Sequence, residues 1–332
     1  MEFRQVVFNG PPDAVLANQS LDTSNLGSTE MVVQTEATLI SQGTEGAAYQ
    51  GLLMPGGAEQ RYPQSPGYAN VARVIAVGSE EGPYKVGDRV FSMSRHTSHA
   101  RLDTATSLCV LVPESLPSQV AVFARLAMVS MSTLRTSTAR LGDNAAVVGL
   151  GLVGNLAAQL CQIAGFTTTG IDLIPWRCDL ARECGIANVL QAPGENDLKP
   201  VNQVVIEATG TVPGAMTGVK LVQRHGELSL VGSQWGVGTQ NTDALRFLGT
   251  IFEQYVHIRS GWERQLPILP NGTSVSSLVH NAQAILGWLD GGRLRVEPML
   301  SHLVNPSQAN TIYGERVANK DRYLGVVFNW QA

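Results

Sequence analysis

The chain has 332 residues, of which 44% are hydrophobic and 15% charged, and its formal net charge is −4 at pH 7. This composition supports a large buried core and argues against disorder, and the length suggests two domains. A mildly acidic chain without a block rich in lysine and arginine is a poor partner for nucleic acid or anionic membranes. The expected partner is a small-molecule substrate.

The cysteines and the apolar runs indicate a cytoplasmic protein. None of the cysteines forms a C-x-x-C pair, which is typical of reduced thiols. Residues 1–13 contain no apolar stretch of the signal-peptide type, so no leader is expected. The longest apolar run, Ala145–Gly165, contains glycines and polar residues that a lipid-facing helix rarely tolerates, so we expect no membrane span. The cysteines are Cys109, Cys161, Cys178 and Cys184.

The first third of the chain consists of short β-type runs separated by glycine and proline. Examples are Met31–Thr38, Ala72–Val77 and Arg89–Phe91. Residues 1–117 are therefore predicted to form a compact β-rich domain.

The pattern changes at about Pro117, where Ser118–Thr138 has helical spacing and apolar strands then alternate with helices. Continuous apolar strands are typical of a parallel sheet covered by helices on both faces. Residues 118–295 are predicted to form such a doubly wound α/β domain. The predicted strands are Ala145–Val148, Thr167–Ile171, Val204–Glu207 and Glu227–Val231, and the predicted helices are Val153–Ala164, Trp176–Cys184 and Asn281–Leu289.

After Val296 the pattern is mixed again. Met299–Val304 and Tyr323–Asn329 are predicted strands on either side of a helix at about Pro306–Val317. We expect residues 296–332 to complete the β-rich domain.

The most informative motif is the glycine-rich turn G-x-G-x-x-G between the first strand and the first helix of the α/β domain. In the dinucleotide-binding motif, Gly149 makes the tight turn, Gly151 lets the backbone approach a pyrophosphate, and Gly154 lets the helix pack on the strand. The amides at the helix start, at Leu152 and Val153, then face the phosphates. The alternative is a glycine-rich turn that binds no nucleotide.

An acidic residue ends the next strand, as the motif requires. The carboxylate of Asp172 is expected to accept hydrogen bonds from the adenosine ribose and to repel a 2′-phosphate. This favours NAD(H) over NADP(H). Arg177 leaves the alternative open, because an arginine nearby can hold a 2′-phosphate.

With these motifs in place, the whole chain resembles the medium-chain dehydrogenase/reductase superfamily. The resemblance extends over Tyr84–Val90, Leu141–Asp143, the glycine motif and Lys320–Val327. It implies a GroES-like β-rich catalytic domain, a Rossmann domain and a homodimer or homotetramer. It also implies that Thr209 and Gly210 border the adenine ribose. Ser233, Gln234 and the Arg259–Trp262 segment are implied to lie beside the nicotinamide.

The chain departs from this superfamily at the zinc ligands. Zinc members carry a Cys-Gly-Thr-Asp-x-His motif, where this chain has Gln42 in place of Cys and Ala47 in place of His. Tyr68 replaces the histidine of their Gly-His-Glu motif, and no ligand residue occurs in the expected third stretch, residues 125–129. Zinc needs about four N, O or S ligands, so we expect no metal. The motifs around Gln42 and Tyr68 are similar to a zinc-lacking branch that includes the bacteriochlorophyllide dehydrogenases, without indicating their substrate.

Without zinc, side chains must stabilise a developing alkoxide. The candidates are Tyr68 as donor to the substrate oxygen and Gln42 as an orienting group. Alternatively, Tyr68 only fills space. Glu45 is either a catalytic carboxylate or a helix cap, and His96 either a proton relay or, with His99, a surface histidine on a loop at the cleft mouth.

The leading hypothesis is a zinc-independent, NAD(H)-dependent enzyme that interconverts a secondary alcohol and a ketone on a small or biosynthetic-intermediate substrate. One alternative is reduction of an activated C=C bond in an enone or quinone. Another is a non-catalytic NAD(H)-binding redox sensor.

Overall fold

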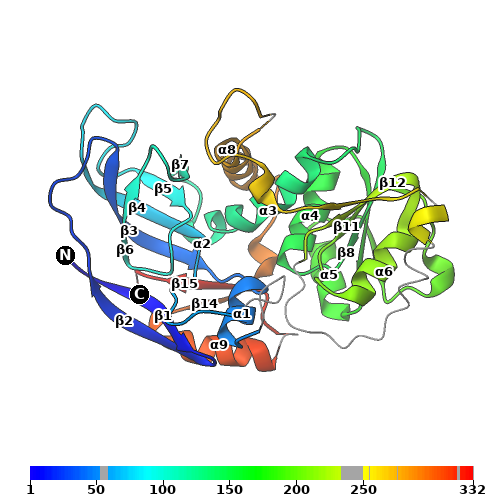
Figure 1. Cartoon of the computed structure of the whole chain (residues 1–332), viewed down its shortest axis with the longest axis horizontal. Helices are drawn as coiled ribbons and strands as arrows, with labels where there is room; N and C mark the ends of the chain where they lie inside the picture. The colour runs from blue at the N-terminus through cyan, green and yellow to red at the C-terminus, as the bar shows by residue number, and fades with distance from the viewer. Residues whose placement is uncertain (53–58, 233–249, 254, 275, 320–321, 332) are drawn as a thin grey trace.

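The computed structural model describes residues 1–332 except 53–58, 233–249, 254, 275, 320–321 and 332. Two sheets dominate it, and Figure 1 shows a β-rich part and a parallel-sheet part side by side, with helices α2, α3 and α8 between them. The predicted α/β class and the GroES-like and Rossmann architecture are confirmed.

The β-rich part contains a seven-stranded sheet in which β14, β15, β3, β4, β5 and β7 lie in this order and β6 pairs with β3. Val327 of β15 lies opposite Leu39 of β3, so β15, from the last part of the sequence, pairs with a strand from its first part. The hairpin of β1 and β2 forms a separate two-stranded sheet. The bounds are β1 Glu2–Gly10, β2 Asp13–Ser20, β3 Glu30–Leu39, β4 Asn70–Val77, β5 Arg89–Ser92, β6 His99–Asp103, β7 Cys109–Leu111, β14 Leu300–Val304 and β15 Gly325–Asn329.

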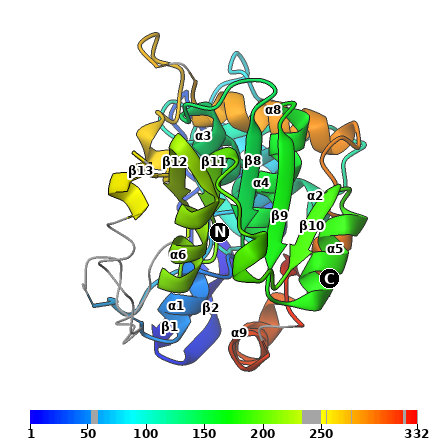
Figure 2. The same ribbon diagram turned by 90° about the vertical axis from the view of Figure 1, so that its right-hand side faces the viewer.

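The second sheet has six parallel strands in the order β10, β9, β8, β11, β12 and β13. Figure 2 faces this part of the molecule and shows β8, β9, β10, β11 and β12 next to one another. The central strands are apolar and buried on both faces, which explains their continuous apolar sequences. The bounds are β8 Asn144–Val148, β9 Thr167–Asp172, β10 Asn188–Gln191, β11 Asn202–Glu207, β12 Val222–Leu230 and β13 His257–Ser260.

The helices fall into two groups. Those of the parallel-sheet part are α4 Leu152–Ile163, α5 Pro175–Glu183 and α6 Val212–Leu221. Those that join or support the β-rich part are α1 Thr44–Tyr49, α2 Ser118–Ala121, α3 Ala124–Arg135, α8 Leu278–Asp290 and α9 Ala309–Ala318. Short 3₁₀ helices are η1 Glu195–Asp197, η2 Glu263–Gln265, η3 Glu297–Met299 and η4 Pro306–Gln308.

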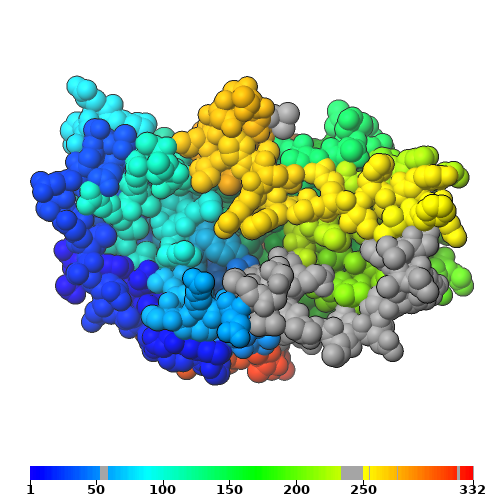
Figure 3. Space-filling model, viewed as in Figure 1, coloured from blue at the N-terminus to red at the C-terminus, as the bar shows by residue number. Residues whose placement is uncertain are grey.

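The largest hydrophobic cluster joins the two parts. Phe91 of the β-rich sheet, Met128 of α3, Leu156 of α4 and Ile285 of α8 all belong to it and are fully buried. In Figure 3 the chain from β13 to α8, yellow to orange, lies across the surface where the two parts meet. The relative position of the two sheets is therefore fixed by a shared apolar core rather than by a linker alone.

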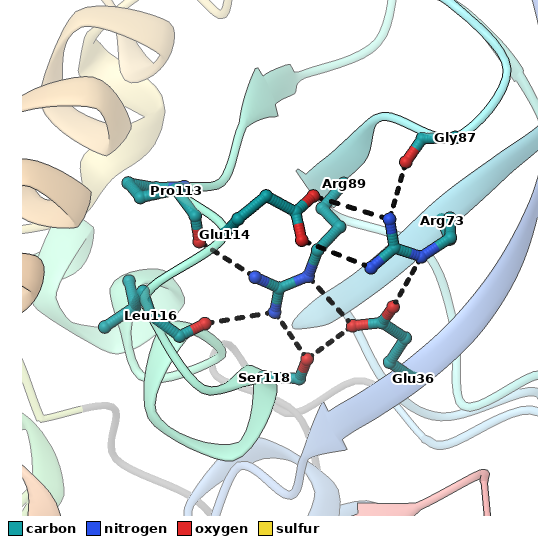
Figure 4. A network of polar contacts seen from close by, with 8 residues as sticks. All are labelled: Glu36, Arg73, Gly87, Arg89, Pro113, Glu114, Leu116 and Ser118. Atoms are coloured by element: carbon teal, nitrogen blue, oxygen red, sulfur yellow. Dashed lines mark hydrogen bonds and ion pairs between the residues drawn. The ribbon is translucent and has the colours of Figure 1, made fainter.

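A buried polar network fixes the point where the chain leaves the β-rich sheet for the helices (Figure 4). Glu36 of β3 accepts hydrogen bonds from Arg73 Nε at 3.2 Å, from Arg89 Nε at 3.1 Å and from the Ser118 hydroxyl. Arg89 also donates to the backbone carbonyls of Pro113 and Leu116 at 2.8 and 3.0 Å. These contacts hold the 113–118 crossover that leads to α2 and α3.

The predicted helix over residues 118–138 is instead two helices, α2 and α3, separated by Val122 and Phe123. Strands β10 and β13 were not predicted, because each is only four residues long and largely exposed. Within the described residues, no helix has the length and apolar character needed to cross a membrane.

Candidate active site

The glycine-rich turn between β8 and α4 has the geometry that a bound pyrophosphate requires. Gly149 has a φ of +91°, which favours glycine, and a Cβ at Gly154 would lie 1.7 Å from the carbonyl oxygen of Gly149. At Gly151, by contrast, no described atom lies within 4 Å of where a Cβ would stand. Gly151 is the N-cap of α4, so Leu152 and Val153 start the helix without a capping side chain. The residues present therefore fit a dinucleotide phosphate.

Asp172 lies at the end of β9 beside this turn and is almost fully buried. Its Oδ2 accepts the Leu150 N–H at 2.7 Å, and its Oδ1 accepts the Ile174 N–H at 2.9 Å. Arg177 Nη1 lies 3.9 Å from Oδ2. The carboxylate is thus held at the edge of the phosphate turn by backbone donors, with a guanidinium close by.

The next loop is organised by Glu207, at the end of β11. Its carboxylate accepts the backbone N–H of Thr209 at 2.7 Å and that of Gly210 at 3.2 Å, and burial raises its pKa. Thr209 also packs against the glycine turn, because a Cβ on Gly149 would lie 2.7 Å from Thr209 Cγ2. Thr209 and Gly210 therefore lie next to the phosphate turn, whereas Ser233 and Gln234 fall outside the described residues.

Tyr68 is partly buried, and its hydroxyl donates to Ser41 Oγ. The guanidinium of Arg125, at the start of α3, lies over the Tyr68 ring with Cζ 4.7 Å from the ring centroid. Burial raises the pKa of Tyr68, while the Arg125 charge and the hydrogen bonds with Ser41 and Thr44 oppose the rise. The phenol is therefore a neutral hydrogen-bond donor at neutral pH.

Gln42 is committed to the C-terminal segment of the chain. Its side-chain Nε2 donates to the backbone carbonyl oxygens of Tyr323 and Leu324, each at 2.6 Å. Its backbone carbonyl oxygen accepts from Arg316 Nη2 at 3.1 Å. The orienting role expected for Gln42 stays a prediction, but these bonds direct its amide nitrogen to the backbone.

The expectation of a surface position for His96 is wrong. His96 has an exposed fraction of 0%, and its Nε2 and Nδ1 lie 2.8 Å from Glu45 Oε2 and Thr38 Oγ1. The local sequence around His96 does not predict its burial, because its hydrogen-bond partners are 51 and 58 positions away. His99, by contrast, is only partly buried.

Glu45 lies in the first turn of α1, which has no side-chain cap, and bonds to groups outside that helix. Its Oε1 accepts the Ser41 N–H at 2.9 Å, while its Oε2 binds His96 and accepts the hydroxyl hydrogen bond of Tyr313. Burial would raise the pKa of Glu45, but His96 and these donors lower it below its ordinary value. The Glu45–His96 pair therefore supports the Ser41 turn from inside, and Tyr68 bonds to Ser41.

The residues gathered at the aligned metal positions do not fit zinc. Gln42 directs its amide to backbone carbonyls, Tyr68 keeps its proton, and Arg125 in the third stretch is itself a cation. Among the described residues, no group of three or more His, Cys, Asp or Glu side chains is placed to hold a metal ion.

Sequence reasoning missed Ser41, Arg125 and Glu263 as members of this site. Residues 125–129 contain no residue type that binds zinc, and the local sequence carries no sign of the partners of Arg125. In the structure Arg125 forms a buried two-pronged ion pair with Glu263 of η2, including Nη1 to Oε2 at 2.6 Å.

Comparison with known proteins shows what this chain is similar to. No family model matches the chain. D-guloside 3-dehydrogenase of Escherichia coli (strain K12) is 29% identical over 171 residues, which cover 48% of this chain and 49% of that protein. The chain thus spans about half the length of the curated relatives it matches. The crystal structure of L-idonate 5-dehydrogenase from Escherichia coli has a TM-score of 0.82 at 17% identity and covers 99% of this chain and 98% of that chain.

A second solved structure, galactitol-1-phosphate dehydrogenase from Escherichia coli, has a TM-score of 0.80 at 16% identity, with 98% of this chain and 99% of that chain covered. The chain therefore resembles medium-chain dehydrogenases/reductases in sequence over about half of its length and in fold over nearly all of it. The resemblance predicted from the sequence is thereby confirmed, including both of its expected folds.

Proposed function

We propose that this chain is an NAD(H)-dependent alcohol dehydrogenase or ketoreductase that works without zinc. Its substrate would be a small secondary alcohol of the polyol or sugar-derivative class. The observation that carries the proposal is the open glycine cradle at the start of α4 with Asp172 at its edge. The names of the guloside and idonate dehydrogenases support the substrate class.

In this proposal the chain holds the cofactor at three places. The amides of Leu152 and Val153 bind the pyrophosphate, Asp172 binds the adenosine ribose, and the Thr209–Gly210 loop borders it. A carboxylate at the ribose favours NAD(H), because it repels a 2′-phosphate. When bound, the nicotinamide supplies or accepts the hydride.

Tyr68 is the proposed hydrogen-bond donor to the substrate oxygen. In the direction of ketone reduction, the carbonyl carbon gains a hydride and its oxygen gains a proton from bulk water, and oxidation of the alcohol is the reverse. While negative charge builds up on that oxygen, Tyr68 donates a hydrogen bond to it. A hydroxyl can donate or accept, so Ser41 can donate to Tyr68 while Tyr68 bonds the substrate oxygen. Because Tyr68 is held by Ser41 and Arg125, its dipole is fixed before the reaction, which is what stabilisation of an alkoxide requires.

Glu45 and His96 have a supporting role in this mechanism. Both are buried and bond to one another, and within the described chain the hydrogen bonds that lead from Glu45 to the phenol pass through Ser41. We infer that they position Ser41 rather than exchange protons with the substrate.

The remaining parts of the proposal concern assembly. We propose a catalytic domain of residues 1–117 with 296–332 and a nucleotide-binding domain of residues 118–295, in a cytoplasmic homodimer. Light scattering of the purified protein measures the oligomeric state.

The test is reduction of NAD⁺ measured across a panel of polyols, sugar derivatives and simple secondary alcohols, with the ketones tested against NADH. Steady turnover with at least one pair, unaffected by a strong chelator, supports the proposal. Turnover only with enones or quinones would favour C=C reduction instead. NADH binding without turnover on any substrate would favour a redox sensor.

A further inference from the structure

Arg125 is a buried cation at the start of residues 125–129, the stretch that aligns with the third zinc ligand of the zinc-type members. Arg125 has a side chain 6% exposed and is held by Glu263 through both terminal nitrogens. Its Nε is buried and has no hydrogen-bond partner within the described part of the chain. The Glu263 carboxylate therefore accepts from both terminal nitrogens of the guanidinium, and the third nitrogen, Nε, is left without an acceptor among the described residues.

The free face of this guanidinium is directed at Tyr68. The 4.7 Å separation between Cζ and the ring centroid lies within the range of a cation–π contact, which gains strength when both groups are removed from water. The Tyr68 hydroxyl donates to Ser41 at the edge of the ring. Arg125 contacts the face of the ring and Ser41 its edge, so two separate segments fix its position.

The Arg125–Glu263 pair also ties α3 to the segment that follows β13. Thr133 of α3 donates to the Gly261 carbonyl at 2.9 Å, so α3 holds the segment after β13 at two points, Gly261 and Glu263. The sequence resemblance places this segment beside the nicotinamide. Arg125 is thus linked to both the phenol and the wall that the cofactor would contact.

We propose that Arg125 is a positioning residue for this reaction, whose clamped guanidinium fixes the Tyr68 ring and favours partial negative charge on its hydroxyl oxygen. A fixed cation of the chain then lies where zinc-type relatives hold a metal ligand, and it acts through Tyr68 rather than on the substrate. The inference rests on the proposed function, because it concerns how the charge of Arg125 acts on Tyr68, the proposed donor to the substrate oxygen.

The charged and titratable groups that act on Tyr68 come from three elements of the described chain. Arg125 of α3 favours the phenolate, and Glu45 of α1 opposes it. Tyr313 of α9 is coupled to Tyr68 and bonded to Glu45. Arg125 is therefore the cation among these three, so a change in its charge has a defined sign at Tyr68.

The experiment replaces Tyr68 with difluorotyrosine, whose phenol is more acidic, and follows its titration by ¹⁹F NMR in the full chain without substrate or cofactor. Arg125→Gln with Glu263→Gln removes both charges of the pair and keeps two polar amides that can bond to each other. This double variant should raise the titration midpoint by about one pH unit or more, given a charge at roughly 5–6 Å and an effective dielectric of about 20.

Two matched variants fix the sign. Glu263→Gln alone leaves the cation uncompensated and should lower the midpoint, while Arg125→Lys keeps the charge and should leave the midpoint near that of the parent. Equal midpoints in all variants would overturn the proposal. If the double variant does not fold, the single variants decide the question: a midpoint lowered in Glu263→Gln but not in Arg125→Lys supports the proposal, and equal midpoints in both overturn it.

Turnover separates this inference from the proposed function. Arg125→Lys should keep most of kcat, whereas Arg125→Gln with Glu263→Gln should lower kcat more than it raises the KM for the alcohol. A midpoint shift with kcat unchanged in the double variant would refute Arg125 as a positioning residue. If no alcohol is oxidised by the parent protein, the proposed function fails, although the midpoint shift is still measured.

Discussion

Replacing Gly154 with alanine should break the packing of α4 on the glycine turn. The added Cβ would lie 1.7 Å from the Gly149 carbonyl oxygen and 3.2 Å from Ala208 Cβ. Atoms in ordinary contact are about 3.4–4 Å apart, so the helix and the turn must separate by roughly 1.5–2 Å. The turn cannot follow easily, because Gly149 has a φ of +91° and donates its N–H to Ile171 O at 2.8 Å. Overpacking of this kind costs about 1–3 kcal/mol or more in unfolding free energy.

Gly151→Ala is the matched control at the same turn. Its backbone has a φ of −65°, which alanine tolerates, and no described atom lies within 4 Å of the new methyl group. The loss in stability should stay below about 1 kcal/mol, the typical difference among N-cap residues. The methyl would instead occupy the space proposed for the pyrophosphate. Loss of one hydrogen bond to a charged group is worth about 1.5–3 kcal/mol, or roughly 10–100-fold in the Kd for NADH.

Urea unfolding followed by circular dichroism measures the first effect, and titration of NADH fluorescence measures the second. We expect Gly154→Ala to unfold at lower urea, whereas Gly151→Ala should unfold like the parent and bind NADH weakly. Parent-like NADH affinity in Gly151→Ala would refute the placement of the pyrophosphate. Parent-like stability in Gly154→Ala would refute the packing argument.

Three further outcomes test the site. Asp172→Ser should narrow the preference for NADH over NADPH, because it removes a repulsion of about 1–3 kcal/mol at an effective dielectric of about 20 and leaves Arg177 near a 2′-phosphate; competitive titration of both cofactors measures it. Tyr68→Phe should keep NADH affinity and lower kcat by about 10²–10³, as loss of one oxyanion donor does, and a near-normal rate would place the donor elsewhere. Elemental analysis should find zinc well below one equivalent, because the side chains at the aligned metal positions do not fit zinc. Stoichiometric zinc that is lost together with activity on chelation would contradict this expectation.

The fold was predictable because its signals are local. The apolar runs of the central strands and the spacing of Gly149, Gly151 and Gly154 report on neighbours within a few residues, and the structure places β8, the turn and α4 in that order. Strands β10 and β13 lie at the two ends of the parallel sheet. Their short sequences carry no apolar pattern, because much of each strand faces solvent.

The candidate site was only partly predictable because its partners are distant in sequence. Gln42 donates to carbonyls 281 and 282 positions away, and Arg125 pairs with a carboxylate 138 positions away. A single side chain gives no sign of which backbone oxygen or charge will face it. The position of Tyr68 beside the third aligned stretch followed from the family motifs, whereas the guanidinium above its ring did not.

The burial of His96 leads to a last prediction, on acid stability. The pKa of Glu45 is lowered in the folded protein, so its ionised form contributes stability above the ordinary glutamate pKa, and this contribution is lost as pH falls through the lowered pKa. Glu45→Gln should cost about 1–3 kcal/mol near neutral pH, because it removes the charge opposite His96 while keeping an acceptor. The difference in unfolding free energy between parent and variant should therefore shrink below about pH 4.3. Glu59→Gln, on an exposed residue, is the control and should follow the parent throughout. If the parent and Glu45→Gln lose stability in parallel down to acid pH, the Glu45–His96 pair does not carry the charge that its geometry indicates.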